Sequence, residues 1–157
     1  MLEIYNSVSG VHQSTRPYSG YIADVLANRG IVFPLTATDD AHYYDGTDET
    51  ISYIVADCRS LATEDIFDAI RNRRFYATQG PRLHVRREGD RIIADCSECV
   101  LISFFSNLSW TGDRSHSGEG LTHAEYKIKD NDRWVRVEVK DALGREAWSN
   151  IIEIGEK

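Results

Sequence analysis

The sequence predicts a mixed fold, in which an α/β half over residues 1–81 is followed by an antiparallel β-sandwich over residues 82–157. Two observations predict this division. Strand-like and helix-like hydrophobic patterns alternate as far as Gly80-Pro81, and only strand-like patterns follow. A Gly-Pro pair is also a typical break between regular elements, so we place the boundary there.

The first half begins with a predicted strand at Leu2–Tyr5 and continues with a helix over residues 21–29. We expect Ser19 to cap this helix and Gly30 to end it in a left-handed conformation. The nearly continuous apolar run over residues 31–37 is typical of a parallel strand buried on both faces. Strand, helix and buried strand in this order predict part of a parallel α/β sheet.

A second helix is predicted to begin near Thr63, where a hydroxyl can cap it. Ile66, Phe67 and Ile70 share one apolar face at helical spacing. The arginines of the segment 71–74 follow at its C-terminal end, where positive charge stabilises a helix. They could attract a phosphate, but their place at the end of a helix explains them without a ligand.

The second half carries the strand patterns of the predicted sandwich. The clearest is Trp134–Lys140, in which valines alternate with charged side chains. We expect Trp110, Trp134 and Trp148 to lie in the core of the sandwich. Further strands are predicted over residues 91–94, 100–105, 124–129 and 147–154. Several short strands separated by Gly and Asp turns are typical of an antiparallel sandwich.

The composition excludes several classes of function. The chain has 157 residues, enough for a core without disulfides, and a formal net charge of −7. This charge argues against binding to nucleic acid or to an anionic membrane surface. No segment approaches the roughly 20 apolar residues of a spanning helix, and the start of the chain lacks the pattern of a signal peptide. With only three cysteines, we expect a reduced, cytoplasmic protein.

The strongest candidate for chemistry is the segment Thr38-Asp39-Asp40-Ala41-His42, which follows the predicted buried strand. Ligands gather at the carboxyl ends of parallel strands. In an extended chain Asp40 and His42 point to the same side, so both could reach one divalent ion. In the alternative interpretation, Asp39 or Asp40 caps a turn and His42 packs locally beside the two tyrosines that follow it.

Three segments together resemble the C-terminal part of PHP-domain proteins, the polymerase and histidinol phosphatase family of metal-dependent phosphoesterases. The segments are Leu2-Glu3-Ile4-Tyr5-Asn6, Ala37-Thr38-Asp39-Asp40-Ala41-His42 and Arg74-Phe75-Tyr76-Ala77-Thr78-Gln79-Gly80-Pro81. The resemblance implies that residues 1–81 form the end of a distorted (β/α) barrel. It also implies that residues 82–157 form an immunoglobulin-like β-sandwich.

The resemblance assigns Asp40 and His42 as metal ligands and implies a divalent ion, Zn, Mn or Fe. Glu3, Tyr5, Asn6 and Asp39 are then candidates for lining the same site. The implied reaction is hydrolysis of a phosphoester, or of a related small-molecule substrate, by metal-activated water.

The sequence also departs from the family pattern. None of its five histidines forms the His-x-His pair with which the family barrel opens, and the segment 73–80 begins with Arg73 where the family usually has Gly. A hydrolytic centre needs at least three protein ligands and an open position for water. We therefore expect at most one weakly held ion, or none, and no activity from this chain alone. The chain would be a fragment of such an enzyme or a protein derived from it.

A different class of function is a non-catalytic binding or assembly module derived from such an enzyme. A half barrel exposes strand edges and an apolar face, so we expect a homodimer or association with the missing barrel half.

Two further segments are weaker candidates for a functional site. Cys96 and Cys99 have Cys-x-x-Cys spacing, although we interpret them as buried structural cysteines. The segment 115–120 is interpreted as a polar hairpin loop, where binding residues are often found.

Overall fold

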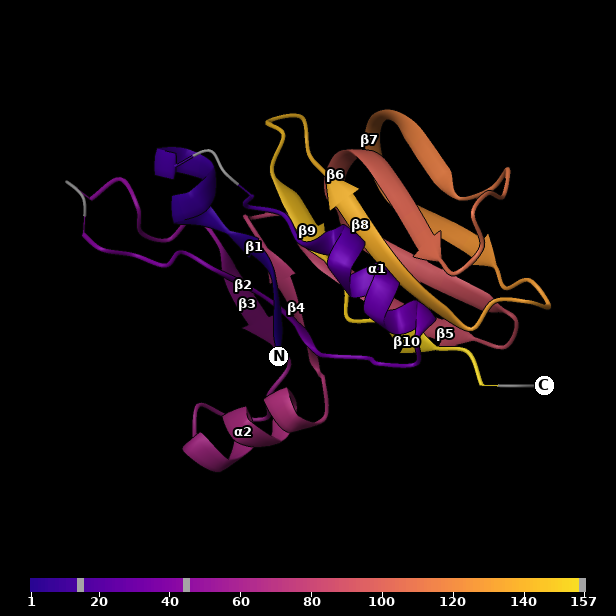
Figure 1. Cartoon of the computed structure of the whole chain (residues 1–157), viewed down its shortest axis with the longest axis horizontal. Helices are drawn as coiled ribbons and strands as arrows, with labels where there is room; N and C mark the ends of the chain where they lie inside the picture. The colour runs from indigo at the N-terminus through magenta and orange to yellow at the C-terminus, as the bar shows by residue number, and fades with distance from the viewer. Residues whose placement is uncertain (14–15, 44–45, 156–157) are drawn as a thin grey trace.

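The computed structural model describes residues 1–13, 16–43 and 46–155, and its ten strands are divided between two sheets (Figure 1). The smaller sheet holds two parallel strands, β1 (Leu2–Asn6) and β2 (Leu35–Thr38). They are joined through the π-helical turn η1 (Ser9–Gln13) and helix α1 (Gly20–Asn28). The predicted parallel β–α–β arrangement is therefore confirmed, as a sheet of two strands.

The larger sheet has eight strands, all paired in antiparallel fashion. Its main path runs in the order β3 (Tyr53–Ala56), β4 (Phe75–Thr78), β9 (Glu146–Trp148), β8 (Trp134–Lys140), β6 (Arg91–Ser106) and β5 (Leu83–Glu88). Strand β7 (Ser115–Lys127) pairs with β6, and β10 (Ile152–Glu153) pairs with β8. The fold is thus mixed and dominated by antiparallel sheet, and the described residues close no barrel.

The predicted boundary at residue 81 falls inside this larger sheet. Strands β3 and β4 precede it, yet β4 pairs with β9 through Ala77↔Trp148 and Thr78↔Ala147. The two halves of the sequence therefore share one hydrogen-bonded sheet, and their independence as domains stays a prediction.

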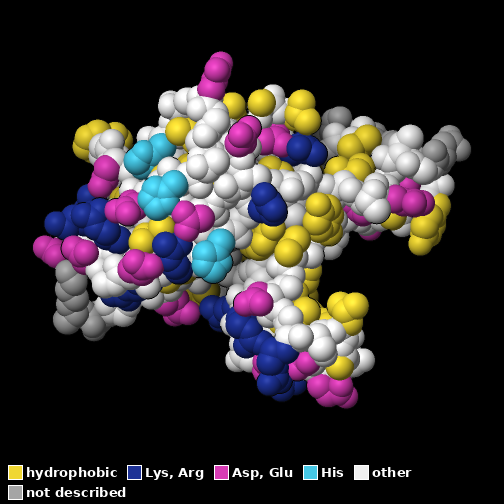
Figure 2. All heavy atoms as spheres, turned by 180° about the vertical axis from the view of Figure 1, so that it is seen from behind, with side chains coloured by type: hydrophobic (Ala, Val, Ile, Leu, Met, Phe, Trp, Pro, Cys, Tyr) yellow, Lys and Arg dark blue, Asp and Glu magenta, His cyan; other side chains and the backbone are white. Residues whose placement is uncertain are grey.

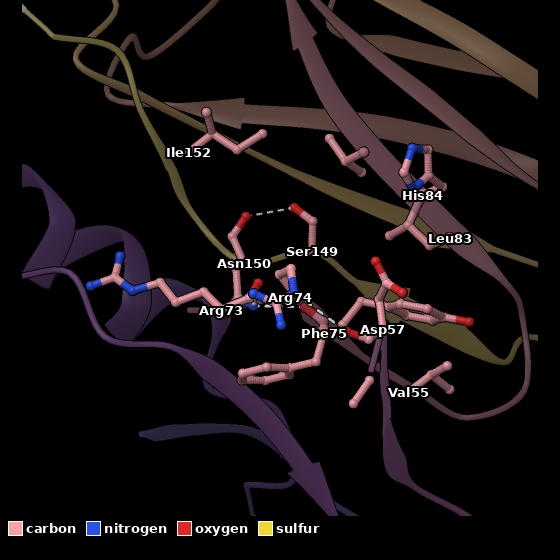
Figure 3. Close-up of a pocket in the computed structure, with 13 residues that line it drawn as sticks. Val55, Asp57, Arg73, Arg74, Phe75, Leu83, His84, Ser149, Asn150 and Ile152 are labelled. Atoms are coloured by element: carbon pink, nitrogen blue, oxygen red, sulfur yellow. Dashed lines mark hydrogen bonds between the residues drawn. The ribbon is translucent and has the colours of Figure 1, made fainter. Parts of the chain in front are cut away.

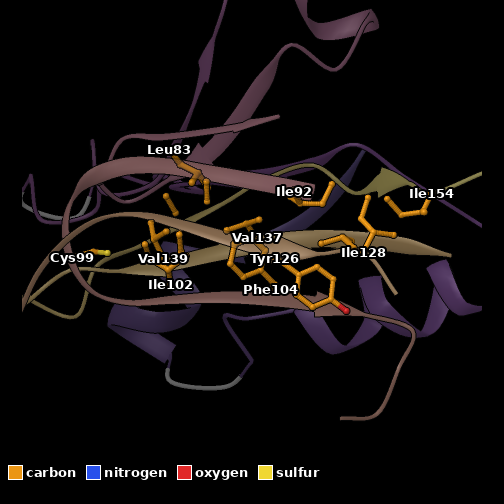
Figure 4. Close-up of a cluster of buried hydrophobic side chains, with 14 residues drawn as sticks. Leu83, Ile92, Cys99, Ile102, Phe104, Tyr126, Ile128, Val137, Val139 and Ile154 are labelled. Carbon is orange, nitrogen blue, oxygen red and sulfur yellow. The ribbon is translucent and has the colours of Figure 1, made fainter. Parts of the chain in front are cut away.

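A first hydrophobic core fills the space around which the larger sheet curves (Figure 4). Strand β6 pairs with β7 along one edge, and with β5 and then β8 along the other. This long strand joins the layers, and buried side chains from β5 to β9 meet between them. The members include Leu83, Ile92, Ile102, Phe104, Tyr126, Ile128, Val135, Val137, Val139 and Ile154.

A second core lies on the opposite face of the larger sheet, against β1, β2 and α1. Trp134 and Trp148 are buried in this second core, with Ile4 and Leu35 among their neighbours. The prediction of a buried position is confirmed for these two tryptophans, although they lie between the parallel strands and the larger sheet. Trp110, in contrast, is 79% exposed, so its predicted core position is wrong.

Helix α1 covers the charged face of β8. The alternation in β8 is confirmed, because its three valines belong to the first core. Its opposite face is also buried: Arg136 is only 1% exposed and donates two hydrogen bonds to Asp24 of α1, from Nε at 2.6 Å and Nη2 at 2.9 Å. Arg136 further bonds Glu138 and lies over the Phe105 ring, with 4.2 Å from Cζ to the ring centroid. The Asp24 carboxylate of α1 compensates the charge of Arg136, so this charged face can be buried.

Helix α2 (Thr63–Arg71) projects away from the two cores (Figure 1). It begins at Thr63 as predicted, but its N-cap residue is Ala62, so no side chain caps the helix. Of its predicted apolar face, Phe67 is 59% exposed. The residue after the C-cap Asn72 is Arg73, whose φ of +56° is the left-handed conformation that favours glycine. The side chain at this position thus carries a backbone strain that a glycine would avoid.

Other expectations are corrected by the backbone. The apolar run 31–37 forms a strand only from Leu35, and Ile31 and Phe33 are partly exposed. Pro34 has no N–H for a ladder, which explains the shorter strand. The segment 115–120, predicted as a loop, belongs to β7. The Ser19 side chain forms no capping bond to α1. Across the described ranges, no helix is long and apolar enough to cross a membrane.

Candidate functional site

The candidate site is built at the carboxyl ends of the two parallel strands. Strand β1 pairs with β2 through Leu2↔Leu35 and ends at Asn6↔Thr38, with an irregularity between Glu3 and Tyr5. Because parallel strands end at the same edge of a sheet, the residues after β2 meet the last residues of β1 there. This topology brings together segments that are more than thirty positions apart in the sequence.

Two carboxylates converge on one amide at this edge. The side-chain Nδ2 of Asn6 donates to Glu3 Oε2 and to Asp40 Oδ2, both at 3.2 Å. Thr38 Oγ1 donates to the other carboxylate oxygen of Glu3. Of the predicted site residues, Glu3, Asn6 and Asp40 are therefore adjacent. Thr38 belongs to the same network. The signal in the sequence for its role is its position, as a polar residue at the end of an apolar strand.

Tyr5 and Asp39 have different surroundings. The Tyr5 ring stacks on Trp148, with 5.4 Å between ring centroids, and so packs on the second core. The Asp39 carboxylate accepts hydrogen bonds from the backbone N–H groups of Ile51 at 2.9 Å and Ser52 at 2.6 Å. Such bonds satisfy buried loop donors, so Asp39 anchors the loop that leads into β3.

His42 is not held beside Asp40 by an extended chain. Strand β2 ends at Thr38, and Asp40 has a left-handed φ of +55°. The strand alternation that would point both side chains to one side therefore does not apply. The backbone N–H of His42 donates to the Asp48 carboxylate, and the residue as a whole is exposed.

The donor set fits a divalent ion only in part. Glu3 and Asp40 offer carboxylate oxygens, which suit Mn²⁺ better than the softer, nitrogen- and sulfur-seeking Zn²⁺. Over the described ranges, however, no group of three or more His, Cys, Asp and Glu side chains is arranged to hold a metal. By themselves these residues do not form a complete hydrolytic centre.

A separate cavity of about 390 Å³ lies where β3, β4, β5 and the segment before β10 meet (Figure 3). Its walls are largely apolar, and the pocket size is in the range of small-molecule sites. The lining residues include Val55, Asp57, Arg74, Phe75, Leu83, His84, Ser149, Asn150 and Ile152.

Most polar groups of this cavity already have partners. Arg74 forms an ion pair with Asp68 at 2.6 Å, and Asn150 donates to the Phe75 carbonyl at 2.7 Å. Asp57 and His84 lie on the same side of the cavity in Figure 3. No sequence motif identified either residue, because the cavity forms only when β3 and β5, distant in sequence, approach the last strand.

A charged row crosses three strands on the outer face of the larger sheet, where Figure 2 shows histidine side chains among acidic and basic ones. In the register of the strands, His84 of β5 lies opposite Asp95 of β6, and Asp95 lies opposite His123 of β7. His123 Nδ1 lies 2.7 Å from Asp95 Oδ1, and Arg86 forms an ion pair with the same carboxylate. The hydrogen bond to His123, followed by that to Arg86, lowers the pKa of Asp95. The Asp95 carboxylate raises the pKa of His123.

Comparison of the chain with protein-family models, with curated proteins and with solved structures finds no match.

Proposed function

We propose that this chain contributes part of the metal site of a PHP-type phosphoesterase and has no hydrolytic activity by itself. The observation that carries the proposal is the convergence of the Glu3 and Asp40 carboxylates on the amide of Asn6. Oxygen donors at the carboxyl ends of parallel strands are typical of divalent-metal sites in α/β enzymes. Residues from another chain or segment would have to supply the remaining ligands.

The proposal includes a relation between folds. Residues 1–81 would correspond to the end of a (β/α) barrel, and residues 82–157 to an immunoglobulin-like sandwich. The parallel pair β1–β2 with its connecting helix supports the first part. The antiparallel strands around one hydrophobic core support the second.

Metal titration tests the site. We expect isothermal titration of the metal-free chain with Mn²⁺ to give one weak site, and Asp40→Asn to abolish it. The matched control is Asp65→Asn, which removes a carboxylate that pairs with Arg59 far from this edge and should leave Mn²⁺ binding unchanged. Equal binding by wild type and Asp40→Asn would refute the assignment of the ligand.

A second measurement tests the incompleteness of the site. We expect no hydrolysis of p-nitrophenyl phosphate in the presence of Mn²⁺, because fewer than three protein ligands cannot hold the ion and leave a place for reactive water. Elemental analysis that finds two or three tightly bound metals per chain would overturn this part of the proposal.

A second candidate function is that of an assembly module that forms a homodimer. It is favoured by the apolar surface around α2, where Leu61 is 89% and Phe67 59% exposed. Tyr53 and Val55 of β3, the edge strand of the larger sheet, are partly exposed as well. Neighbouring exposed apolar residues on a sheet edge and a projecting helix are typical of a protein interface.

Analytical ultracentrifugation distinguishes this candidate from the first. We expect a concentration-dependent dimer that Phe67→Lys dissociates. Leu143→Lys is the control, because Leu143 is equally apolar and 77% exposed but lies in the turn between β8 and β9. A wild-type chain that stays monomeric at all concentrations would exclude the assembly module and leave the metal-site proposal intact.

A further inference from the structure

The strand β6 contains an irregularity at the two cysteines of its Cys-x-x-Cys segment. Pairing with β7 moves from Asp95↔His123 to Cys99↔Leu121, so four steps along β6 oppose two steps along β7. Two extra residues are therefore accommodated in a β-bulge. On the other side, Arg82 N–H donates to Ser97 Oγ at 3.0 Å, which ties the bulge to the start of β5.

This bulge brings the two thiols into contact. In a regular strand, residues three positions apart lie about 10 Å from each other and point to opposite faces. Cys96 Sγ and Cys99 Sγ instead lie 3.6 Å apart, and both cysteines are reduced. Cys99 is buried in the first core, whereas Cys96 is only half-buried at its margin. Cys96 is thus the more exposed of the two cysteines, and the Cys99 thiol lies in contact with it on the side of the core.

We propose that Cys96 and Cys99 form a redox-sensitive modification site, which a low-molecular-weight disulfide such as oxidised glutathione converts into an intrachain disulfide. The thiolate of Cys96 attacks one sulfur of the reagent, forms a mixed disulfide and releases one glutathione thiolate. The Sγ of Cys99 then loses its proton, attacks Cys96 Sγ and displaces the second glutathione. Two protein thiols are oxidised, one reagent disulfide is reduced to two thiols, and no other oxidant is needed.

The environment of Cys96 sets the rate of this exchange. Burial, followed by the neighbouring Cys99 thiol, raises the pKa of Cys96. Because the thiolate is the nucleophile, oxidation is slow at neutral pH. As long as the pH stays below that pKa, the rate rises by roughly tenfold for each unit of pH increase. This inference does not depend on the proposed function, since the bulge lies in β6, away from the Glu3 and Asp40 carboxylates.

The experiment follows the thiols of the whole chain. The reduced protein is incubated with oxidised glutathione at pH 8, quenched with acid, and alkylated with N-ethylmaleimide in denaturant. Trypsin then leaves both cysteines of the pair in one peptide, Ile92–Arg114, and separates them from Cys58. We expect the peptide to lose two hydrogens and to gain no alkyl group, and dithiothreitol to reverse the change.

Cys58 provides the matched control in the same molecule. It has no neighbouring thiol, so we expect it to be alkylated or to carry glutathione. Cys58→Ser should still form the internal disulfide, whereas Cys99→Ser should stop at the mixed disulfide on Cys96. The proposal is overturned if wild type retains both thiols of Ile92–Arg114, or retains glutathione on Cys96, once incubation with excess oxidised glutathione has continued until the composition of the mixture no longer changes.

Discussion

Replacing Asp24 with Asn removes the carboxylate that helix α1 presents to the buried guanidinium of Arg136. Arg136 is 1% exposed and Asp24 22%, and two hydrogen bonds of 2.6 and 2.9 Å join them. Loss of one partner from a buried pair typically costs 3–5 kcal/mol. Glu138 still contacts Arg136, and Asp24 is partly hydrated, so we expect the lower end, about 3 kcal/mol.

Urea denaturation followed by circular dichroism measures this loss. With a slope of about 2 kcal/mol per M, the midpoint should fall by about 1.5 M. In an Arg136→Met background the same substitution should cost less than about 1 kcal/mol, because no buried cation remains. The control is Arg59→Met, whose side chain is 82% exposed in its pair with Asp65. If Asp24→Asn and Arg59→Met shift the midpoint equally, the buried pair does not stabilise the contact between α1 and β8.

Three further outcomes are expected. Arg73→Gly should raise the free energy of unfolding by up to about 1 kcal/mol in thermal denaturation, because glycine adopts the φ of +56° without strain. Trp134→Phe should be more destabilising than Trp148→Phe by about 1 kcal/mol, because only the indole N–H of Trp134 has a partner among the described residues. Proton NMR should give His123 a pKa above its value in the urea-unfolded chain, and Asp95→Asn should reduce the difference to the smaller contribution of Glu125. The raised pKa of His123 stabilises the fold below about pH 6.5 and loses its effect as the pH rises through the folded-state value. The lowered pKa of Asp95 acts above about pH 3.9 and loses its effect as the pH falls, so the pair is most effective between these limits.

The elements with a clear period could be predicted from the sequence. The alternation in Trp134–Lys140 gives β8 its bounds, because every second side chain belongs to the first core. The pattern could not reveal that the opposite face is buried too. Arg136 and Glu138 are typical of a solvated face, and only the approach of Asp24 from α1 makes their burial possible. Tertiary context, not local pattern, decides such cases.

Strand β3 and the geometry of the candidate site could not be predicted from the hydrophobic pattern of the sequence. Tyr53–Ala56 has only four residues, too few for a reliable period, and β4 defines it as a strand by pairing along its whole length. At the candidate site, the sequence predicted polar residues after a strand, and the structure places Glu3, Asn6 and Asp40 together. The left-handed φ of Asp40 carried no signal, because its own residue type does not require that conformation.

The pairing of β4 with β9 also constrains how the chain can fold while it is synthesised. Thr78 reaches its partner Ala147 only after about 70 further residues have been added, which takes roughly 4–14 s at typical rates of translation. During that interval one edge of β4 is open, and Ile4 and Leu35 lack the tryptophans that later cover them. The nascent N-terminal half therefore exposes a free strand edge and apolar side chains that the complete fold covers. A chaperone or a second nascent chain would bind it at this stage.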